Sequence, residues 1–85
     1  MIMNQFITTD IALATYLSLQ GFIIERIQKN DLNTRKKKFV FENKNEIEKE
    51  VEKFYNKEAR VCPLRYYQEL KIIKSRLYDE NAANF

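Results

Sequence analysis

Apolar and polar residues follow two kinds of pattern along the chain, one typical of strands and one typical of helices. Strands are predicted over residues 3–8, 22–29 and 36–42, and helices over 11–20, about 43–55 and 63–78. The stretch NDLNT at 30–34 favours a turn, so the second and third strands are predicted to form an antiparallel hairpin. The order β-α-β-β-α-α is typical of an α+β fold, with helices packed on one face of a small antiparallel sheet made of the hairpin and the N-terminal strand. The pattern leaves open which hairpin strand pairs with the N-terminal strand.

The first helix has the clearest boundaries. Thr8 and Thr9 precede Asp10, so a hydroxyl can cap the first free amides and the carboxylate favours the positive end of the helix. Gly21 is the single glycine of the chain and follows an Ala- and Leu-rich run. Because glycine readily adopts a left-handed conformation, Gly21 is predicted to end this helix.

The two strands of the predicted hairpin lead into a second helix. In the strand over 36–42, Phe39 and Phe41 share one face, and the other face carries Lys38, Val40 and Glu42. Asn43 and Glu46 then have the spacing of a capping box. An apolar stripe follows, formed by Ile47, Val51, Phe54 and Tyr55. The opposite side is expected to be solvated, and it carries Glu46, Glu48, Lys49, Glu50, Glu52 and Lys53.

The last helix is predicted to begin at Pro63, a residue that suits the first turn, and to run to about Tyr78. Its apolar stripe is formed by Tyr66, Leu70, Ile73 and Leu77. Residues 79–85 are expected to be a flexible C-terminal tail, which leaves one domain over residues 1–78. Cys62 lies before the proline, so it is expected in a break between helices, as a buried or half-buried thiol.

Composition excludes several classes of site. The chain of 85 residues has no histidine, one cysteine and one glycine, which excludes an ordinary zinc site, a phosphate-binding glycine loop and a Rossmann motif. Cys62 has no histidine to activate it, and the glutamates lie among lysines on a solvated helix face, where carboxylate pKa values are not raised. We therefore expect a protein that is not an enzyme and has no catalytic residues, no metal and no cofactor.

The location is also suggested by composition. A single cysteine cannot form an internal disulfide, no apolar run reaches membrane-spanning length, and the N-terminal MIMNQFITTD lacks a basic leader region. These features indicate a cytoplasmic protein that does not interact with a membrane.

The net charge of +3 is concentrated in two basic regions, residues 35–38 and 60–76. The first opens the stretch RKKKFVFE and contains Arg35, Lys36, Lys37 and Lys38. One interpretation is a hairpin arm that binds phosphates, aided by Arg65 and Arg76 and by the lysines of the last helix. The other interpretation is that these cations keep a sheet edge soluble.

The last helix carries more apolar residues than one buried stripe requires. A second side is formed by Leu64, Tyr67, Lys71, Lys74 and Tyr78, while Arg65, Arg76 and Ile72 lie on the far flank. Exposed tyrosines beside cations are typical of surfaces that bind partners, so the first group is a candidate partner-binding site. Alternatively, a small core wraps this helix on two sides.

Three segments carry a resemblance: FITTDIALATYLSLQGF, KKFVFE and VCPLRYYQELKIIKSRLY. Over roughly residues 5 to 78, the chain resembles a family of small uncharacterised phage and mobile-element proteins of unknown function. The resemblance implies a phage-type accessory protein in the cytoplasm of a host cell, and it brings no catalytic residues.

Three hypotheses of function follow. The first is a non-enzymatic protein that binds a protein or nucleoprotein partner and inhibits or adapts a host nucleic-acid-handling or defence complex. The second is a nucleic-acid-binding regulatory protein that uses hairpin residues 35–38 and helix 63–78. The third is an oligomeric structural or virion component in which a homo-oligomer buries the patch on the last helix.

Overall fold

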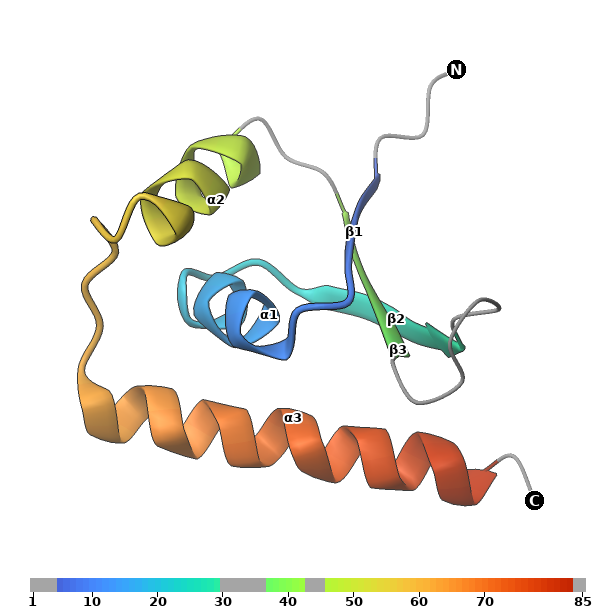
Figure 1. Ribbon diagram of the computed structural model, residues 1–85. Coiled ribbons are helices and arrows are strands. Elements are labelled where there is room, and N and C mark those ends of the chain that lie inside the picture. The colour runs from blue at the N-terminus through green and yellow to red at the C-terminus, as the bar shows by residue number, and fades with distance from the viewer. Residues whose placement is uncertain (1–4, 30–36, 43–45, 84–85) are drawn as a thin grey trace.

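The computed structural model describes the backbone of residues 5–29, 37–42 and 46–83, and the side chains of residues 5–28, 37–42 and 46–77. The elements in chain order are β1 (Gln5–Thr8), α1 (Ile11–Leu19), β2 (Ile24–Lys29), β3 (Lys37–Glu42), α2 (Ile47–Tyr55) and α3 (Pro63–Ala83). The three strands form one small sheet, and the helices are gathered on one side of it (Figure 1). The predicted order β-α-β-β-α-α and the α+β class are therefore confirmed.

The sheet has the order β1-β3-β2, so the N-terminal strand pairs with the second strand of the hairpin. Both outer strands are antiparallel to β3. They are therefore parallel to each other, and α1 is the crossover between them, as in a split β-α-β unit. Phe41 of β3 lies opposite Phe6 of β1 on one side and opposite Ile24 of β2 on the other. An irregularity between Ile24 and Arg26 shifts the register of β2 by one residue.

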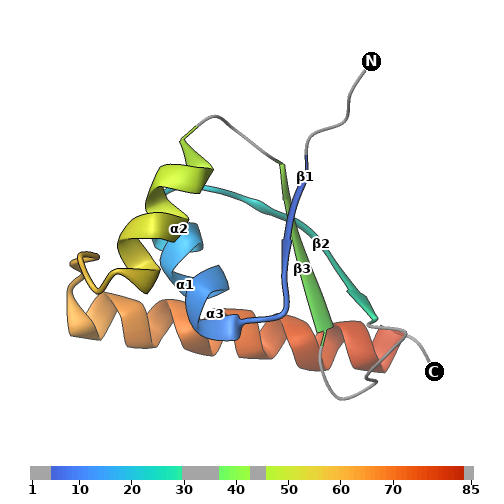
Figure 2. The same cartoon turned by 45° about the horizontal axis from the view of Figure 1, so that its top comes forward.

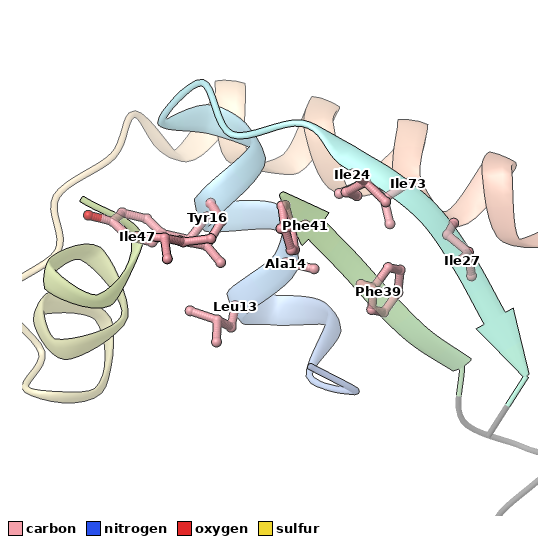
Figure 3. Close-up of a cluster of buried hydrophobic side chains, with 10 residues drawn as sticks. Leu13, Ala14, Tyr16, Ile24, Ile27, Phe39, Phe41, Ile47 and Ile73 are labelled. Carbon is pink, nitrogen blue, oxygen red and sulfur yellow. The ribbon is translucent and has the colours of Figure 1, made fainter. Parts of the chain in front are cut away.

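The core lies between the sheet and α1 (Figures 2 and 3). Phe39 and Phe41 of the central strand are at most 2% exposed, and they pack with α1 and with Ile73 of α3. The whole cluster of buried residues is Leu13, Ala14, Tyr16, Leu17, Ile24, Ile27, Phe39, Phe41, Ile47 and Ile73. Since α2 and α3 each pack on α1, this short helix holds the other two in place.

The boundaries of α1 agree with their prediction, but the cap of its first amides is the carboxylate of Asp10 and not a threonine hydroxyl. One carboxylate oxygen of Asp10 accepts hydrogen bonds from the backbone N–H groups of Ala12, at 3.0 Å, and Leu13, at 3.4 Å. Thr8 contributes differently, because its hydroxyl oxygen accepts from the N–H of Asp10 itself. At the other end, Gly21 has a φ of +98°, the left-handed conformation expected of it.

Val40 lies on the opposite face of β3 from Phe39 and Phe41, as predicted, yet its exposure is 0%. Its register partners are Ile7 of β1 and Arg26 of β2. Because β3 is the central strand, Val40 has a strand neighbour on each side. Val40 is therefore part of the buried apolar surface without belonging to the main cluster.

The structure corrects three predictions for α2. Glu46 is the N-cap residue and its side chain caps nothing, so it cannot be the third residue of a capping box; Asn43 lies outside the described residues. Tyr55 was assigned to the core stripe, but it is 56% exposed, because it lies about 80° from Ile47 around the helix axis. Glu50 was assigned to the solvated side, yet only 19% of its side chain is exposed.

The last helix begins at Pro63 as predicted and continues past Tyr78 to Ala83. The helix is therefore longer than predicted, since residues 79–83 include no glycine or proline and end with two alanines, which favour helix; the flexibility of residues 79–85 stays a prediction. Within the described part of the chain, no helix is both long enough and apolar enough to cross a membrane.

Candidate functional site

One side of α3 is fixed to the rest of the molecule. Ile73 is 1% exposed, and Tyr66 and Leu77 pack against the same cluster of buried residues. Two polar contacts add to this packing: the Tyr66 hydroxyl donates to the carbonyl oxygen of Ala12 at 3.1 Å, and the Ser18 hydroxyl of α1 donates to a carboxylate oxygen of Glu69 at 2.6 Å. The predicted stripe is thus confirmed as the buried side, and it sets the direction in which the other side faces.

The opposite side of α3 carries apolar side chains in solvent. Leu64 is 62% exposed and Tyr67 is 57% exposed, and Lys71 and Lys74 are also exposed. Their spacings of three, four and three residues place them on one side of the helix. We call these four residues the α3 strip. Tyr78 was predicted to extend it, but its side chain lies outside the described residues.

The α3 strip is positively charged. The Lys71 ammonium lies 5.2 Å from the centre of the Tyr67 ring, within the range of a cation–π contact. Among the described side chains, the ion pairs are Arg26 with Glu25 and Lys53 with Glu50, so neither lysine of the strip forms one. Lys71 and Lys74 are three residues apart, a spacing at which like charges repel.

The two arginines predicted for the second hypothesis do not join the strip. Arg65 is exposed and Arg76 is half-buried, and they lie on the far flank of α3 with Ile72, which is 55% exposed. The structure therefore presents two separate rows of cations along α3, as the helical spacing predicted. A single basic row along this helix is absent from the described side chains.

The basic region before β3 is described only in part. Arg35 and Lys36 lie outside the described residues, while Lys37 and Lys38 are half-buried at the start of β3. Strand β1 pairs with residues 39–42 alone, so this end of β3 has a strand neighbour only in β2. Lysines at such an unpaired segment discourage further strand pairing. Whether the region also binds phosphates stays a prediction.

Cys62 differs from its prediction, because the residue is exposed rather than buried. It does lie in the expected break before Pro63, and its carbonyl oxygen accepts the N–H of Tyr66 at 2.9 Å. Hydrogen bonds from the backbone N–H groups of Arg65 and Leu64 lower the pKa of the thiol, and the positive charge of Arg65 acts in the same direction. The position of a proline in the sequence predicts a break between helices, but it does not show whether the side chain before it is exposed.

Cys62 lines a hollow of about 280 Å³ between the end of α1 and the start of α3. The hollow is lined by Leu19, Gln20, Arg60, Val61, Cys62 and Arg65. The described side chains include no group of three or more Cys, Asp or Glu residues arranged to hold a metal ion. The chemistry that this hollow offers is therefore that of an exposed thiol beside two arginines.

A contact that the sequence did not reveal joins α1 and α2. The Tyr16 hydroxyl donates to a carboxylate oxygen of Glu50 at 2.6 Å, and burial together with this hydrogen bond raises the pKa of Tyr16 to about 12. The two residues line a second hollow of about 300 Å³ with Lys53 and Arg60. The one available sign was that Glu50 lies three residues after Ile47, at the edge of the apolar stripe.

Among the comparisons with known proteins, only the comparison with protein families gives a match. No match to the chain is found among curated proteins or among solved structures. Residues 3–79 match a family described as "Domain of unknown function (DUF5659)". The expected resemblance to an uncharacterised family is confirmed, whereas a phage or mobile-element origin stays a prediction. Because the match covers nearly the whole chain of 85 residues, this protein belongs to the DUF5659 family.

Proposed function

We propose that this protein is a non-enzymatic binding module that docks a protein partner on the α3 strip, defined above as Leu64, Tyr67, Lys71 and Lys74. The observation that carries the proposal is the exposure of Leu64 and Tyr67, each more than half exposed, on a helix that already contacts the core through Tyr66, Ile73 and Leu77. Tyrosine is enriched among the residues that dominate binding energy at protein interfaces.

The way α3 is held supports this function. Its buried side is anchored by Ile73 and by the hydrogen bonds of Tyr66 and Glu69 to α1. A surface that is already ordered loses little conformational entropy when a partner binds, so more of the contact energy appears as affinity. Recognition of this kind needs packing and charge alone, and no chemical step.

The biological setting rests on the sequence. A phage-type accessory protein in a host cytoplasm that inhibits or adapts a nucleic-acid-handling or defence complex stays a prediction. A binding module suits that role, because a small protein can block or bridge a larger complex with one exposed helix side.

The proposal is tested by selecting random peptides, displayed on a carrier, against the immobilised wild-type protein. Peptides enriched on the wild type are then measured against Leu64→Ala and Tyr67→Ala, with Tyr55→Ala as a matched control. Tyr55 is 56% exposed but lies on α2, so its loss should leave binding unchanged. Since interface tyrosines are often worth 2 kcal/mol or more, Tyr67→Ala should weaken binding by about 30-fold. Enriched peptides that bind all three variants equally would refute the α3 strip as the docking site.

A second candidate function is nucleic-acid binding at the hairpin end, favoured by one observation in the register. The Cα positions of Lys29 and Lys37 face each other across β2 and β3. This register brings two lysine positions of the sequence together beside Lys38, and basic residues gathered in one place favour phosphate binding. Anisotropy of labelled DNA and RNA at about 50 and 200 mM salt tests this, because phosphate-dependent binding falls steeply over that range. Binding that Lys37→Glu/Lys38→Glu leaves intact, or no binding at the lower salt, would exclude it.

A further inference from the structure

We propose that the partner segment docked on the α3 strip is acidic: a helical segment of another protein, with one apolar cluster and one pair of carboxylates separated along its length. This inference rests on the proposed function and names the class of partner that the strip would accept. It depends on the charges of α3, on their local pairing and on the order of residues along the strip.

The described part of α3, residues 63–77, carries little negative charge on its solvent side. Over residues 63–77 the helix has four cations, Arg65, Lys71, Lys74 and Arg76, and a single anion, Glu69. Glu69 lies on the side that faces α1, where it accepts the hydrogen bond from Ser18. The four cations therefore have no described carboxylate beside them on the solvent side, and a complementary partner must supply the negative charge.

The two lysines of the strip also have no acidic residue three or four positions away in the sequence. Side chains three and four residues apart are neighbours on a helix, and an acidic residue at such a position would neutralise a lysine. The neighbours of Lys71 at these spacings are Tyr67, Gln68, Lys74 and Ser75. The neighbours of Lys74 are Leu70, Lys71, Leu77 and Tyr78. None is acidic, so carboxylates from a partner would replace the Lys71–Lys74 repulsion by attraction.

The order of residues along the strip determines the order required in the partner. Leu64 and Tyr67 form its apolar part, towards the start of the helix, and Lys71 and Lys74 form its cationic part. The midpoints of the two pairs are seven residues apart, which corresponds to about 10 Å along a helix axis. A partner helix would therefore carry apolar side chains and carboxylates about seven residues apart, two turns along the same face.

Charge distinguishes this partner from the other possible occupants. Two lysines allow about two phosphate contacts, while DNA-binding proteins commonly make six to ten, so nucleic acid is a poor match for the strip. A second copy of the chain also fits poorly. Its α2 carries Glu48 and Glu52 four residues apart on one side, but Lys49 and Lys53 lie on the adjacent side, so this helix offers less complementary charge than an acidic segment does.

The test uses the composition of peptides selected on the wild-type protein and their affinity by fluorescence anisotropy. Enriched peptides are expected to combine Asp or Glu pairs with apolar residues. The Lys71→Glu/Lys74→Glu variant should bind these peptides about 10-fold more weakly or worse, since each exposed ion pair contributes up to about 1 kcal/mol and charge reversal adds repulsion. The matched control is Lys49→Glu/Arg60→Glu, which changes net charge equally at exposed positions outside the strip and should leave affinity unchanged. Peptides with lysine in place of the acidic pair should bind the Lys71→Glu/Lys74→Glu variant better than the wild type.

Each alternative result is informative, provided that circular dichroism shows all variants folded. Enriched peptides that lack acidic residues but still require Tyr67 would overturn the acidic partner and leave the docking surface standing. Peptides that are insensitive to Leu64 and Tyr67 would overturn the proposed function itself. Sedimentation of a wild-type dimer that Tyr67→Ala dissociates would assign the strip to a second copy. DNA binding that collapses with salt and requires Lys71 and Lys74 would assign the strip to nucleic acid.

Discussion

The Tyr16 hydroxyl donates a hydrogen bond of 2.6 Å to a carboxylate oxygen of Glu50, and this contact joins α1 to α2. Tyr16 is 3% exposed, and the Lys53 ammonium lies 3.6 Å from the other oxygen of Glu50. The carboxylate is therefore shared between a buried donor and a surface cation. Burial and the hydrogen bond to Glu50 raise the pKa of Tyr16 from 10.0 to about 12.

Tyr16→Phe is expected to lower the free energy of unfolding by about 1–2 kcal/mol at pH 7, because a hydrogen bond to a charged acceptor is lost and Glu50 stays partly desolvated. The shifted pKa also predicts a pH dependence. Because the folded pKa of Tyr16 lies above its unfolded value, the contribution is complete below pH 10 and is lost as pH rises through about 12. Urea denaturation between pH 7 and 12 measures both effects, and Tyr16→Phe should lose less stability than the wild type above pH 10.

The matched control for this experiment is Tyr67→Phe, which removes a hydroxyl from an exposed tyrosine. Its unfolding curve should follow that of the wild type at every pH. Tyr55 and Tyr66, whose pKa values are also raised by burial, remain in both variants and so contribute equally. If the free energy of unfolding of Tyr16→Phe declined as steeply as that of the wild type between pH 10 and 12, the pH dependence could not be assigned to Tyr16.

Spacing in the sequence predicted which residues share a helix face, but it did not predict which distant segments contact each other. Ile47 and Val51 fall on the buried side of α2 as expected, because helical spacing alone determines which residues share a face. Spacing cannot show that β1 pairs with β3, or that Glu50 lies opposite Tyr16, since both depend on segments far apart in the chain. For the same reason it missed the exposure of Cys62, which depends on how α1 and α3 meet.

The residues of the candidate site on α3 could be identified from the sequence more directly than the contacts between elements. Leu64 and Tyr67 exceeded the needs of one apolar stripe, and both are exposed in the structure. Their exposure follows from the packing of α3, which contacts the core through Tyr66, Ile73 and Leu77, and it argues against a core that wraps this helix on two sides at these positions. Which partner covers those residues depends on a second molecule, which the sequence of one chain does not describe.

Tyr66 and Tyr67 are adjacent in sequence, but the same substitution should destabilise the protein at Tyr66 far more than at Tyr67. Tyr66 is half-buried and bonded to Ala12, so Tyr66→Ala is expected to cost about 2–4 kcal/mol of unfolding free energy. Tyr67→Ala removes an exposed ring and should change stability by no more than about 0.5 kcal/mol. Thermal and urea unfolding of the two variants measure the difference. Equal destabilisation would place Tyr67 in the core and remove the surface on which docking depends.

Gly21 and Lys57 both have a positive φ, and substitutions at these two positions should change the stability in opposite directions. Gly21, at φ +98°, has open space around its missing Cβ, so Gly21→Ala should destabilise by about 1 kcal/mol through the backbone alone. Lys57 has a φ of +62° after the end of α2, where glycine would be unstrained, so Lys57→Gly should stabilise by about 0.5–1 kcal/mol. Urea denaturation measures both. Destabilisation by Lys57→Gly would show that the lysine side chain makes a contact worth more than the backbone strain.

Cys62 should react as a thiolate at lower pH than an ordinary cysteine. Its sulfur accepts hydrogen bonds from the N–H groups of Arg65 and Leu64, which stabilise the thiolate and lower the thiol pKa. The rate of alkylation by iodoacetamide, followed against pH, gives the midpoint of ionisation. The matched control is a Cys62→Ser/Ser75→Cys variant, because Ser75 is exposed in the middle of α3, where backbone N–H groups are already bonded. The wild-type midpoint should lie below that of this variant. Coincident curves would show that the start of α3 does not act on the thiol.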